Sequence, residues 1–405
     1  MEKVLPFIRR LQIPQDTERL WPGDAVGRVL AEDVVASIEV PSFTRSTVDG
    51  YAVRASDTFG ASEGLPAILP IAGEVKMGKP AGSLPAGSAV EIPTGGMLPE
   101  GADAVVMVEY TEALGDGSVA VYSPVAPGDN VIVRGEDFQP GGVIVPAGRK
   151  LRPMDVAAIA AVGVARVTVF RKLSVFVLST GDELRPPGEV PGDGEIFDIN
   201  GLALCGMIHN EMMKPVFGGI VRDDPQRIRE TLKKGLESCD AAVVSGGTSA
   251  GPADVIASVI DELGEPGVLV HGLAMRPGKP TVIGVVSGKP VLGLAGHPAS
   301  AMMVFEVVAR PILNALAGRT LTADIQVGRV LATLTRAVSS RAGREDFIRC
   351  TLRYDGGKVF AEPVMGKSGL VTTMLKASGY FKVPLEKEGF AAGDTVEVTF
   401  FGGSL

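Results

Sequence analysis

The spacing of apolar residues changes at about Leu173, and the two sides predict different architectures. Before this point, short apolar runs are separated by glycine and proline, as at 33–40, 67–75, 104–109 and 131–133. Short runs bounded by turn residues are typical of strands, so we expect one or two β-rich modules here. One helix is predicted among them, over 154–162, because Pro153 suits a first helical turn and Gly163 ends the run.

From Leu173 to about residue 316, apolar runs alternate with helical patterns. Buried strands are predicted at 173–178, 216–221, 241–244, 268–270, 281–286 and 291–294. Helices are predicted over about 200–209, after Asp224 as N-cap with Pro225 in the first turn, and from Pro298 onward with a kink at Pro311. Strands that alternate with helices predict a doubly wound α/β domain with a parallel or mostly parallel sheet.

After about Gly318 the helical patterns stop. Strands are predicted at 326–334, 347–354, 358–363 and 395–401, with a hairpin turn at Asp355-Gly356-Gly357. A small C-terminal β-barrel or sandwich is therefore expected. Because 405 residues exceed the size of a single core, the fold class is a multi-domain combination of α/β and β parts.

Charge and composition narrow the classes of partner. The net charge is -8 and no block of lysine or arginine occurs, which argues against nucleic-acid binding. The most apolar stretch, 156–170, is short for a membrane span and carries Arg166, and the start of the chain lacks an export-type apolar segment. We therefore expect a soluble cytoplasmic protein. Three cysteines that lie far apart predict buried free thiols: Cys205, Cys239 and Cys350.

Four loops at predicted strand ends combine glycine, hydroxyl and charged residues: 179–183, 245–254, 275–279 and 293–300. Ligands of parallel α/β sheets collect at the carboxyl ends of strands. Glycine lets backbone N–H groups approach an anion, and a helix that follows adds a partial positive charge. Each loop alone could be a plain connection, but four on one sheet edge favour a site for phosphate or another oxyanion.

Charged residues in and beside these loops extend the prediction. Arg276 and Lys279 are candidate anion clamps. Carboxylates beside an anion site would repel the ligand, and Mg²⁺ resolves that conflict by binding carboxylate and phosphate oxygens together. The candidate metal ligands are Asp182, Glu183, Asp223 and Asp254. Helix capping is an equally good explanation for Asp223 and its neighbour Asp224.

Other patterns in the chain are less informative. The segment 73–79 has the spacing of a phosphate-binding P-loop, but Pro80 replaces the hydroxyl residue that holds Mg²⁺. The three histidines are too scattered to predict a zinc site, and His297 alone lies in a candidate loop. The clusters 46–53 and 91–99 are also compatible with ordinary turns.

Those clusters nevertheless belong to a series of motifs that runs along nearly the whole chain. The motifs include Asp49-Gly50-Tyr51-Ala52-Val53, Pro93-Thr94-Gly95, Arg134-Gly135-Glu136-Asp137, Ser179-Thr180-Gly181-Asp182-Glu183-Leu184, Ser245-Gly246-Gly247 with Gly251 and Asp254, Pro277-Gly278-Lys279-Pro280, and Gly293-Leu294 with Gly296, Pro298 and Ser300. In residues and order, the chain resembles the molybdopterin molybdenumtransferases, a family that includes the E domain of gephyrin.

The resemblance implies a reaction in which molybdate is inserted into adenylylated molybdopterin, with Mg²⁺-dependent release of AMP. It implies catalytic roles for Asp49, Thr94, Asp137, Glu183 and Asp254. It implies substrate binding by Ser245, Gly246, Gly247, Thr248, Ser249, Gly251, Arg276, Gly278, Lys279, Gly296, Pro298, Arg349 and Ser368. Our hypothesis is that the 245–254 loop and Lys279 hold phosphate, while Asp49 and Thr94 orient the metal oxyanion.

The resemblance also implies an organisation into four parts. These are an elongated discontinuous domain of residues 1–50 with 135–170, a β-rich domain of 51–134, the α/β domain of 171–318 and a C-terminal β-barrel of 319–405. A homodimer with sites built from both subunits is implied, with a molybdopterin adenylyltransferase and molybdoenzyme maturation proteins as possible partners. Arg276 stands where the family often has lysine, and the choice between molybdate and tungstate is left open. A gephyrin-like binding scaffold and an adenylyltransferase are the alternative functions.

Overall fold

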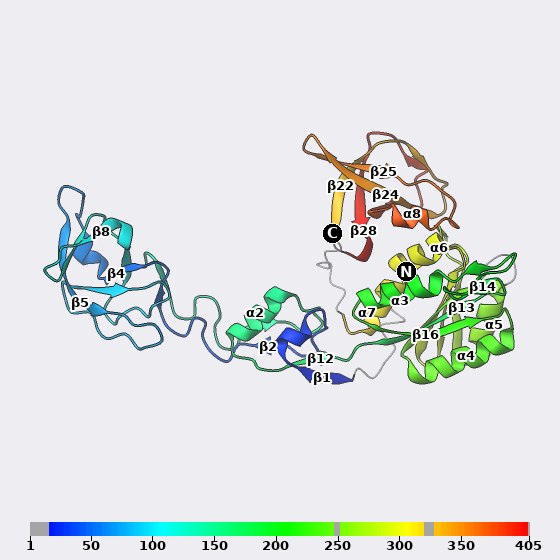
Figure 1. The fold of residues 1–405 in the computed structure, drawn as a ribbon, viewed down its shortest axis with the longest axis horizontal. Coiled ribbons are helices and arrows are strands. Elements are labelled where there is room, and N and C mark those ends of the chain that lie inside the picture. Colours follow the sequence, from blue (N-terminus) through cyan, green and yellow to red (C-terminus); the bar gives the residue numbers. More distant parts are fainter. Residues whose placement is uncertain (1–15, 247–251, 320–327, 404–405) are drawn as a thin grey trace.

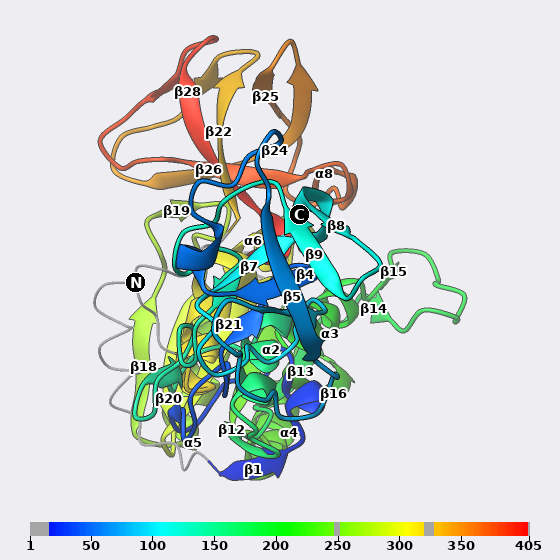
Figure 2. The ribbon, with the colours of Figure 1, turned by 90° about the vertical axis from the view of Figure 1, so that its left-hand side faces the viewer.

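The computed structural model describes residues 16–246, 252–319 and 328–403, without the side chains of 252–254 and 403. The chain is elongated, with a β-rich part at one end and the α/β part at the other (Figure 1). Helix α2 (Pro153–Ala161) and the pair β1 (Thr17–Leu20) and β12 (Val167–Phe170) lie between them. The C-terminal barrel stands beside the α/β part, and the loop between β14 (Leu184–Arg185) and β15 (Ile196–Phe197) projects from it (Figure 2).

The α/β part is built on one six-stranded sheet, so the predicted doubly wound, mostly parallel sheet is confirmed. The strand order is β16 (Lys214–Val221), β13 (Ser174–Thr180), β17 (Ala241–Gly246), β21 (Lys289–Ala295), β20 (Val282–Val286) and β18 (Pro266–His271). Strand β20 is antiparallel to both of its neighbours, and the other adjacent pairs are parallel. All strands except β20 therefore end at the same edge of the sheet.

Helices cover both faces of this sheet because its strands are apolar on both sides. In β13, Val175 and Val177 face one hydrophobic core while Phe176 and Leu178 face the other. The first core is shared with α3 (Asn200–Asn210), α6 (Pro298–Val304), the π turn η4 (Phe305–Ala309) and α7 (Arg310–Leu316). The second is shared with α4 (Pro225–Ser238) and α5 (Pro252–Leu263).

Two of the sequence predictions about these helices can be judged directly. Asp224 caps α4, because its carboxylate accepts hydrogen bonds from the N–H groups of Gln226 and Arg227 at 2.9 and 3.3 Å. Near Pro311, where a kink was predicted, the helix contains the π turn η4, which ends two residues before the proline. Pro311 has no N–H to donate to an ordinary helical turn. The helix Pro298–Leu316 is long and apolar enough to cross a membrane, but most of it is buried inside the molecule. It is the core helix of the α/β part.

The C-terminal part is a closed barrel rather than a sandwich. Its strands follow the order β24 (Glu345–Asp355), β25 (Lys358–Pro363), β22 (Arg329–Leu334), β28 (Thr395–Phe400) and β26 (Gly379–Val383), and β26 returns to β24. Gly356 and Gly357 have φ values of 54° and 78° between the paired Asp355 and Lys358, so the predicted hairpin turn is confirmed. Strand β26 was missed by the sequence analysis, as were helix α8 (Thr372–Leu375), the short turn η5 (Phe401–Gly403) and the pair β23 (Val338–Ser339) and β27 (Gly389–Phe390).

The first part of the chain forms one larger sheet and three short strand pairs. The sheet order is β7 (Ala104–Met107), β4 (Gly50–Val53), β6 (Ala89–Ile92), β5 (Ala67–Glu74), β9 (Ser118–Val121) and β8 (Thr111–Ala113). Besides β1–β12, the pairs are β2 (Val34–Val35) with β11 (Val143–Val145) and β3 (Arg45–Ser46) with β10 (Val131–Ile132). Single turns of helix lie at η1 (Pro22–Ala25), η2 (Ala55–Thr58) and η3 (Val108–Tyr110). The residue boundaries of the four domains stay predictions.

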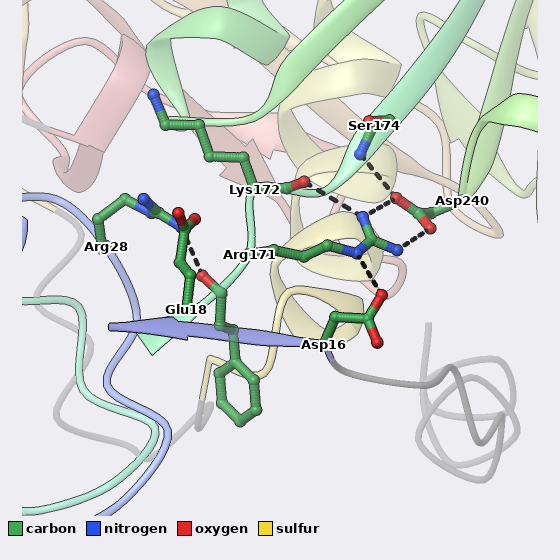
Figure 3. Close-up of polar contacts among 8 residues, drawn as sticks. Asp16, Glu18, Arg28, Arg171, Lys172, Ser174 and Asp240 are labelled. Carbon is green, nitrogen blue, oxygen red and sulfur yellow. Dashed lines mark hydrogen bonds and ion pairs between the residues drawn. The ribbon is translucent and has the colours of Figure 1, made fainter. Parts of the chain in front are cut away.

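A charged cluster fastens the elongated part to the α/β part (Figure 3). Arg171 donates to both carboxylate oxygens of Asp240, at 2.8 and 2.6 Å, and its Nε donates to Asp16 at 3.2 Å. The N–H of Ser174 donates to Asp240 at 2.7 Å. Arg171 thus joins the residue before β1 to the residue before β17.

The three cysteines are free, as predicted. Cys239 and Cys350 are buried, and burial raises the pKa of the Cys350 thiol to about 12. Cys205 is only half-buried, which differs from the prediction because it lies on the side of α3 that is only partly covered.

Candidate functional site

The loops singled out in the sequence lie at one edge of the α/β sheet. Residues 181–183 follow β13, Asp223 follows β16, Ser245 and Gly246 end β17, the segment 272–281 follows β18, and 296–300 follow β21. The strands that they follow all point the same way. The carboxyl edge of the sheet therefore gathers these segments, as expected for a ligand site of this architecture.

Three of the four candidate metal ligands lie near one another at this edge. Burial, followed by the charges of Asp182 and Glu183, raises the pKa of Asp223, although hydrogen bonds from Thr180 and the Asp182 backbone oppose the rise. The carboxylates therefore repel one another, as they would in an oxygen-ligand site for a cation. Within the described residues, no three acidic, histidine or cysteine side chains converge closely enough to hold a metal on their own.

The glycine-rich loop after β17 is only partly described. Ser245 is buried and its Oγ accepts a hydrogen bond from Asn200 Nδ2 at 2.8 Å. Gly246 has no room for a side chain, because a Cβ there would lie 2.2 Å from Thr180 Oγ1. Gly247, Thr248, Ser249 and Gly251 lie outside the described residues, and Asp254 is placed only as part of helix α5.

A cavity of about 1000 Å³, the cationic pocket, lies where the α/β part meets the barrel. The two parts are joined here because β19 (Met275–Arg276) pairs with β24 of the barrel. Among the described residues, the charged side chains that line the pocket are all cationic: Arg276, Lys279, Arg344, Arg349 and Lys367. His297, Ser300 and Ser368 line it as well. This composition is suited to a small, multiply charged anion.

Arg349 is a buried cation in the wall of the cationic pocket. Its side chain is 8% exposed, and its Nε and Nη1 have no hydrogen-bond partner within the described parts of the chain. Burial, followed by the charge of Arg276, lowers the pKa of Arg349. A buried guanidinium with unused donors is costly unless an anion satisfies it. Arg349 is therefore a candidate ligand for an oxyanion in the pocket.

Two loops shape the rest of the pocket wall. Gly278 has a φ of 110°, and a Cβ there would lie 2.2 Å from Val304, so only glycine fits between Pro277 and Lys279. Ser368 Oγ lies 3.2 Å from His297 Nδ1, and the carbonyl of Ser368 accepts from the N–H of Ala299 at 3.1 Å. Pro298 opens α6 between these contacts. The barrel loop is thus held against the start of the core helix.

The remaining candidates lie elsewhere in the chain. Asp49 and Thr94 are brought together, since the N–H of Thr94 donates to Asp49 Oδ1 at 2.7 Å. Both belong to the β-rich part, which lies at the opposite end of the elongated molecule from the α/β part (Figure 1). Asp137 is exposed, and its N–H donates to the carbonyl of Val40 in the connecting part. A single chain does not bring these three residues to the cationic pocket.

Sequence reasoning missed several residues that the structure places at the site. Arg344 and Lys367 line the cationic pocket, but isolated cations in loops carry no distinctive pattern. Asp198 and Asn200 are buried beneath the sheet edge, and Asp198 Oδ1 accepts from the N–H of Gly201 at 3.0 Å. The signal that could have found them is the pattern Asp198-Ile199-Asn200-Gly201 at the start of a helix beside a candidate loop.

Comparisons with known proteins agree with this arrangement along the chain. The model of the MoeA N-terminal region (domain I and II) matches residues 1–163, a probable molybdopterin binding domain matches 176–315, and the MoeA C-terminal region (domain IV) matches 332–401. The molybdopterin molybdenumtransferase of Haemophilus influenzae is 32% identical over 402 residues, which cover 98% of this chain and 97% of the relative. That of Bacillus subtilis is 32% identical over 391 residues, covering 95% and 89%.

Solved structures give the same result. The crystal structure of a molybdopterin biosynthesis MoeA protein from Pyrococcus horikoshii OT3 covers 99% of both chains, with a TM-score of 0.83 and 32% sequence identity. Identity above 30% over nearly the full length of several relatives establishes common ancestry. The chain belongs to the molybdopterin molybdenumtransferase family and is a transferase of molybdenum cofactor biosynthesis.

Proposed function

We propose that the chain inserts molybdate into adenylylated molybdopterin, with Mg²⁺-dependent release of AMP. The observation that carries this proposal is the cationic pocket with Arg349, whose Nε and Nη1 have no hydrogen-bond partner among the described residues. Molybdate is a compact dianion, and the pocket offers it five cationic side chains where the α/β part meets the barrel. The reaction requires the oxyanion to meet a phosphorylated pterin, which the adjacent strand-end loops would hold.

The pocket leads us to revise where the oxyanion would be bound. The sequence hypothesis gave that role to Asp49 and Thr94, but Asp49 is a carboxylate whose Oδ1 already accepts from the N–H of Thr94. A carboxylate repels molybdate, whereas Arg349, Lys279 and Ser368 offer donors. We propose that these three bind the oxyanion, and that Asp49 and Thr94 contact the pterin end of the substrate.

The fit of Mg²⁺ rests on the carboxylates at the sheet edge. Mg²⁺ in proteins is often held by one or two carboxylates together with substrate phosphates, so a complete protein cage is not required. Asp182, Glu183 and Asp223 would hold it, with Asp254 from the start of α5. When bound, Mg²⁺ would neutralise charge on the phosphate oxygens as the bond to AMP breaks.

The protein's own contribution would be positioning and electrostatic stabilisation. Ser245, Gly246 and the residues that follow would hold phosphate oxygens through backbone N–H and hydroxyl donors. Arg349, Lys279 and Ser368 would hold the oxyanion in the cationic pocket through charge and hydrogen bonds. No covalent enzyme intermediate is needed, because breaking a phosphoanhydride depends mainly on alignment and charge.

We further propose that the active unit is a homodimer. Asp49 and Thr94 belong to the β-rich part, which lies at the other end of the molecule from the cationic pocket. A second copy that places its β-rich part against the sheet edge would bring both sets together, and homodimers are the commonest soluble assemblies. A cytoplasmic location is proposed as well, because phosphorylated pterins and AMP are too highly charged to cross membranes unaided.

The test is an assay of AMP release by the full-length protein with adenylylated molybdopterin, molybdate and Mg²⁺. We expect release that depends on molybdate and Mg²⁺, and that falls at least tenfold in Arg349→Met. The matched control is Arg353→Met, because Arg353 lies on the same strand with an exposed side chain outside the pocket. Parent protein that releases no AMP would refute the proposal. Repeating the assay with tungstate would decide the preferred oxyanion.

A further inference from the structure

Asn200, the first residue of α3, forms hydrogen bonds to residues at the ends of two neighbouring strands of the sheet. Its side-chain nitrogen donates to Ser245 Oγ at 2.8 Å and to the carbonyl of Gly296 at 2.7 Å. Ser245 belongs to the end of β17, and Gly296 follows β21. One buried amide group therefore links the end of β17 to the loop that opens α6.

The second of these loops continues directly to the cationic pocket. Gly296 is followed by His297, whose Nδ1 lies 3.2 Å from Ser368 Oγ on the pocket wall. The N–H of Ala299 donates to the carbonyl of Ser368 at 3.1 Å. A continuous series of contacts thus leads from Ser245 through Asn200 and His297 to Ser368. It connects the end of β17 to the wall of the cationic pocket.

The surroundings of Asn200 are unusually polar for a buried position. Within the described residues, Asn200 Oδ1, Asp198 Oδ2 and Ser179 Oγ are buried and lack hydrogen-bond partners. The space is also tight, because a Cβ on Gly201 would lie 2.5 Å from Asp198 Oδ2 and 2.7 Å from Ser179 Oγ. Buried polar atoms without partners lower stability. This cost is explained if the amide has a task in the reaction.

We propose that Asn200 is a positioning residue that sets the separation between Ser245, at the end of β17, and the cationic pocket. The inference rests on the proposed function, since it assumes that one substrate spans both loops. The phosphates of the adenylylated molybdopterin would be held beside Ser245, while the dithiolene sulfurs of the same molecule would meet the oxyanion near Ser368. A shift of about 1 Å between such groups can lower a rate about a hundredfold. Removing the bridge should therefore slow turnover more than it weakens binding of either substrate.

The first experiment compares Asn200→Ala with Asn200→Asp and the control Asn314→Ala in the full-length protein. Asn314 is also buried in the α/β part, but it donates to Glu211 at 3.1 Å, away from the sheet edge. We expect kcat for AMP release to fall roughly tenfold to a hundredfold in both Asn200 variants, with each KM within about threefold of the parent. Asn200→Asp keeps the shape but faces the Gly296 carbonyl with an acceptor, so it tests the bridge if the alanine variant fails to fold.

The second experiment separates positioning from simple stability. Ser245→Ala and Ser368→Ala are combined in a double-mutant cycle on kcat/KM, in the parent and in the Asn200→Ala background. In the parent we expect non-additivity of roughly threefold or more, and without Asn200 the two effects should become additive. Coupling that persists without Asn200, or a kcat unchanged in both Asn200 variants, would overturn the inference.

A third measurement does not depend on turnover. Backbone hydrogen exchange at 245–246 and 297–299 should become faster in Asn200→Ala and stay unchanged in Asn314→Ala. Unchanged exchange in Asn200→Ala would also overturn the inference. Failure of the proposed function would be seen differently, as a parent protein that releases no AMP while the exchange of both loops still depends on Asn200.

Discussion

Arg276 and Arg349 share the cationic pocket, but their charges are compensated unequally. Arg276 Nη1 lies 3.9 Å from Asp346 Oδ2, and Asp346 is fully buried. Nε and Nη1 of Arg349 have no partner in the part of the chain that the structure describes, and the charge of Arg276 adds to the effect of burial in lowering its pKa. The protein therefore holds a buried cation whose charge an incoming anion would satisfy.

Replacing Arg349 should separate stability from function. We expect Arg349→Met to raise the free energy of unfolding by about 1 kcal/mol, because it removes a buried charge that lacks a partner. Molybdate should raise the melting temperature of the parent by mass action and leave that of the variant unchanged. Thermal unfolding with and without molybdate checks both effects, with Arg353→Met as the control. A destabilised variant that still responds to molybdate would contradict the pocket assignment.

Mixed dimers can test whether the site is shared between two copies of the chain. The variants Asp49→Asn and Arg349→Met should each lose most of their AMP release when expressed alone. If each site takes Asp49 from one copy and Arg349 from the other, every mixed dimer has one intact site. Coexpression of the two variants should then restore roughly a quarter of parent activity, since about half of the dimers are mixed.

The control for this experiment pairs two variants from the same half of the site. Asp49 and Thr94 contact each other, so Asp49→Asn mixed with Thr94→Ala leaves a defect in every site. That mixture should stay inactive. Activity that does not recover in the first mixture would show that one chain forms the site alone or that these residues serve another purpose.

Much of the fold could be predicted because apolar periodicity reports burial directly. Val175 and Phe176 face opposite cores, and such two-sided runs mark central strands of a parallel sheet. The antiparallel placement of β20 could not be predicted, since strand direction depends on contacts between distant segments. Strand β2 has only two residues where the sequence predicted eight, because the surrounding chain pairs through isolated bridges instead.

The site was less predictable than the fold because its residues come from separate parts of the chain. Glycine-rich loops at strand ends pointed to the sheet edge, but the grouping of Arg276 with Arg349 depends on the pairing of β19 with β24. Asn200 was missed because its partners Ser245 and Gly296 are 45 and 96 positions away. Contacts of that range leave no mark on local sequence spacing.

The acidic cluster predicts an effect of replacing Asp223 that its neighbour Asp224 should not share. The pKa of Asp223 is raised, so the stability linked to its protonated form is present below the usual carboxyl pKa and is lost as pH rises through the raised value. At neutral pH without Mg²⁺, Asp223→Asn should therefore be slightly more stable than the parent, by less than about 1 kcal/mol because the group is partly exposed. It should also need roughly tenfold more Mg²⁺ for half-maximal AMP release.

Asp224→Asn is the matched control for this prediction, because Asp224 caps α4 and asparagine is also a good N-cap. Its Mg²⁺ requirement and stability should stay close to those of the parent. Titration of AMP release against Mg²⁺, together with thermal unfolding in a chelator, measures both properties. Equal Mg²⁺ requirements in Asp223→Asn and Asp224→Asn would remove Asp223 from the metal site.

The contact of Asp240 with Arg171, which joins the elongated part to the α/β part, predicts a stability that falls at low pH (Figure 3). Burial alone would raise the pKa of Asp240, but hydrogen bonds from Arg171 and Ser174 outweigh it and leave the pKa below the usual value. A lowered carboxyl pKa contributes stability that is present above about pH 4 and is lost as pH falls through the lowered value. Asp240→Asn should therefore cost roughly 1–3 kcal/mol at pH 7, because the charged hydrogen bonds to Arg171 weaken. Denaturant unfolding across pH should show the gap between variant and parent shrinking below pH 4, and a gap that stays constant down to pH 3 would mean that packing, not the carboxylate charge, holds the junction.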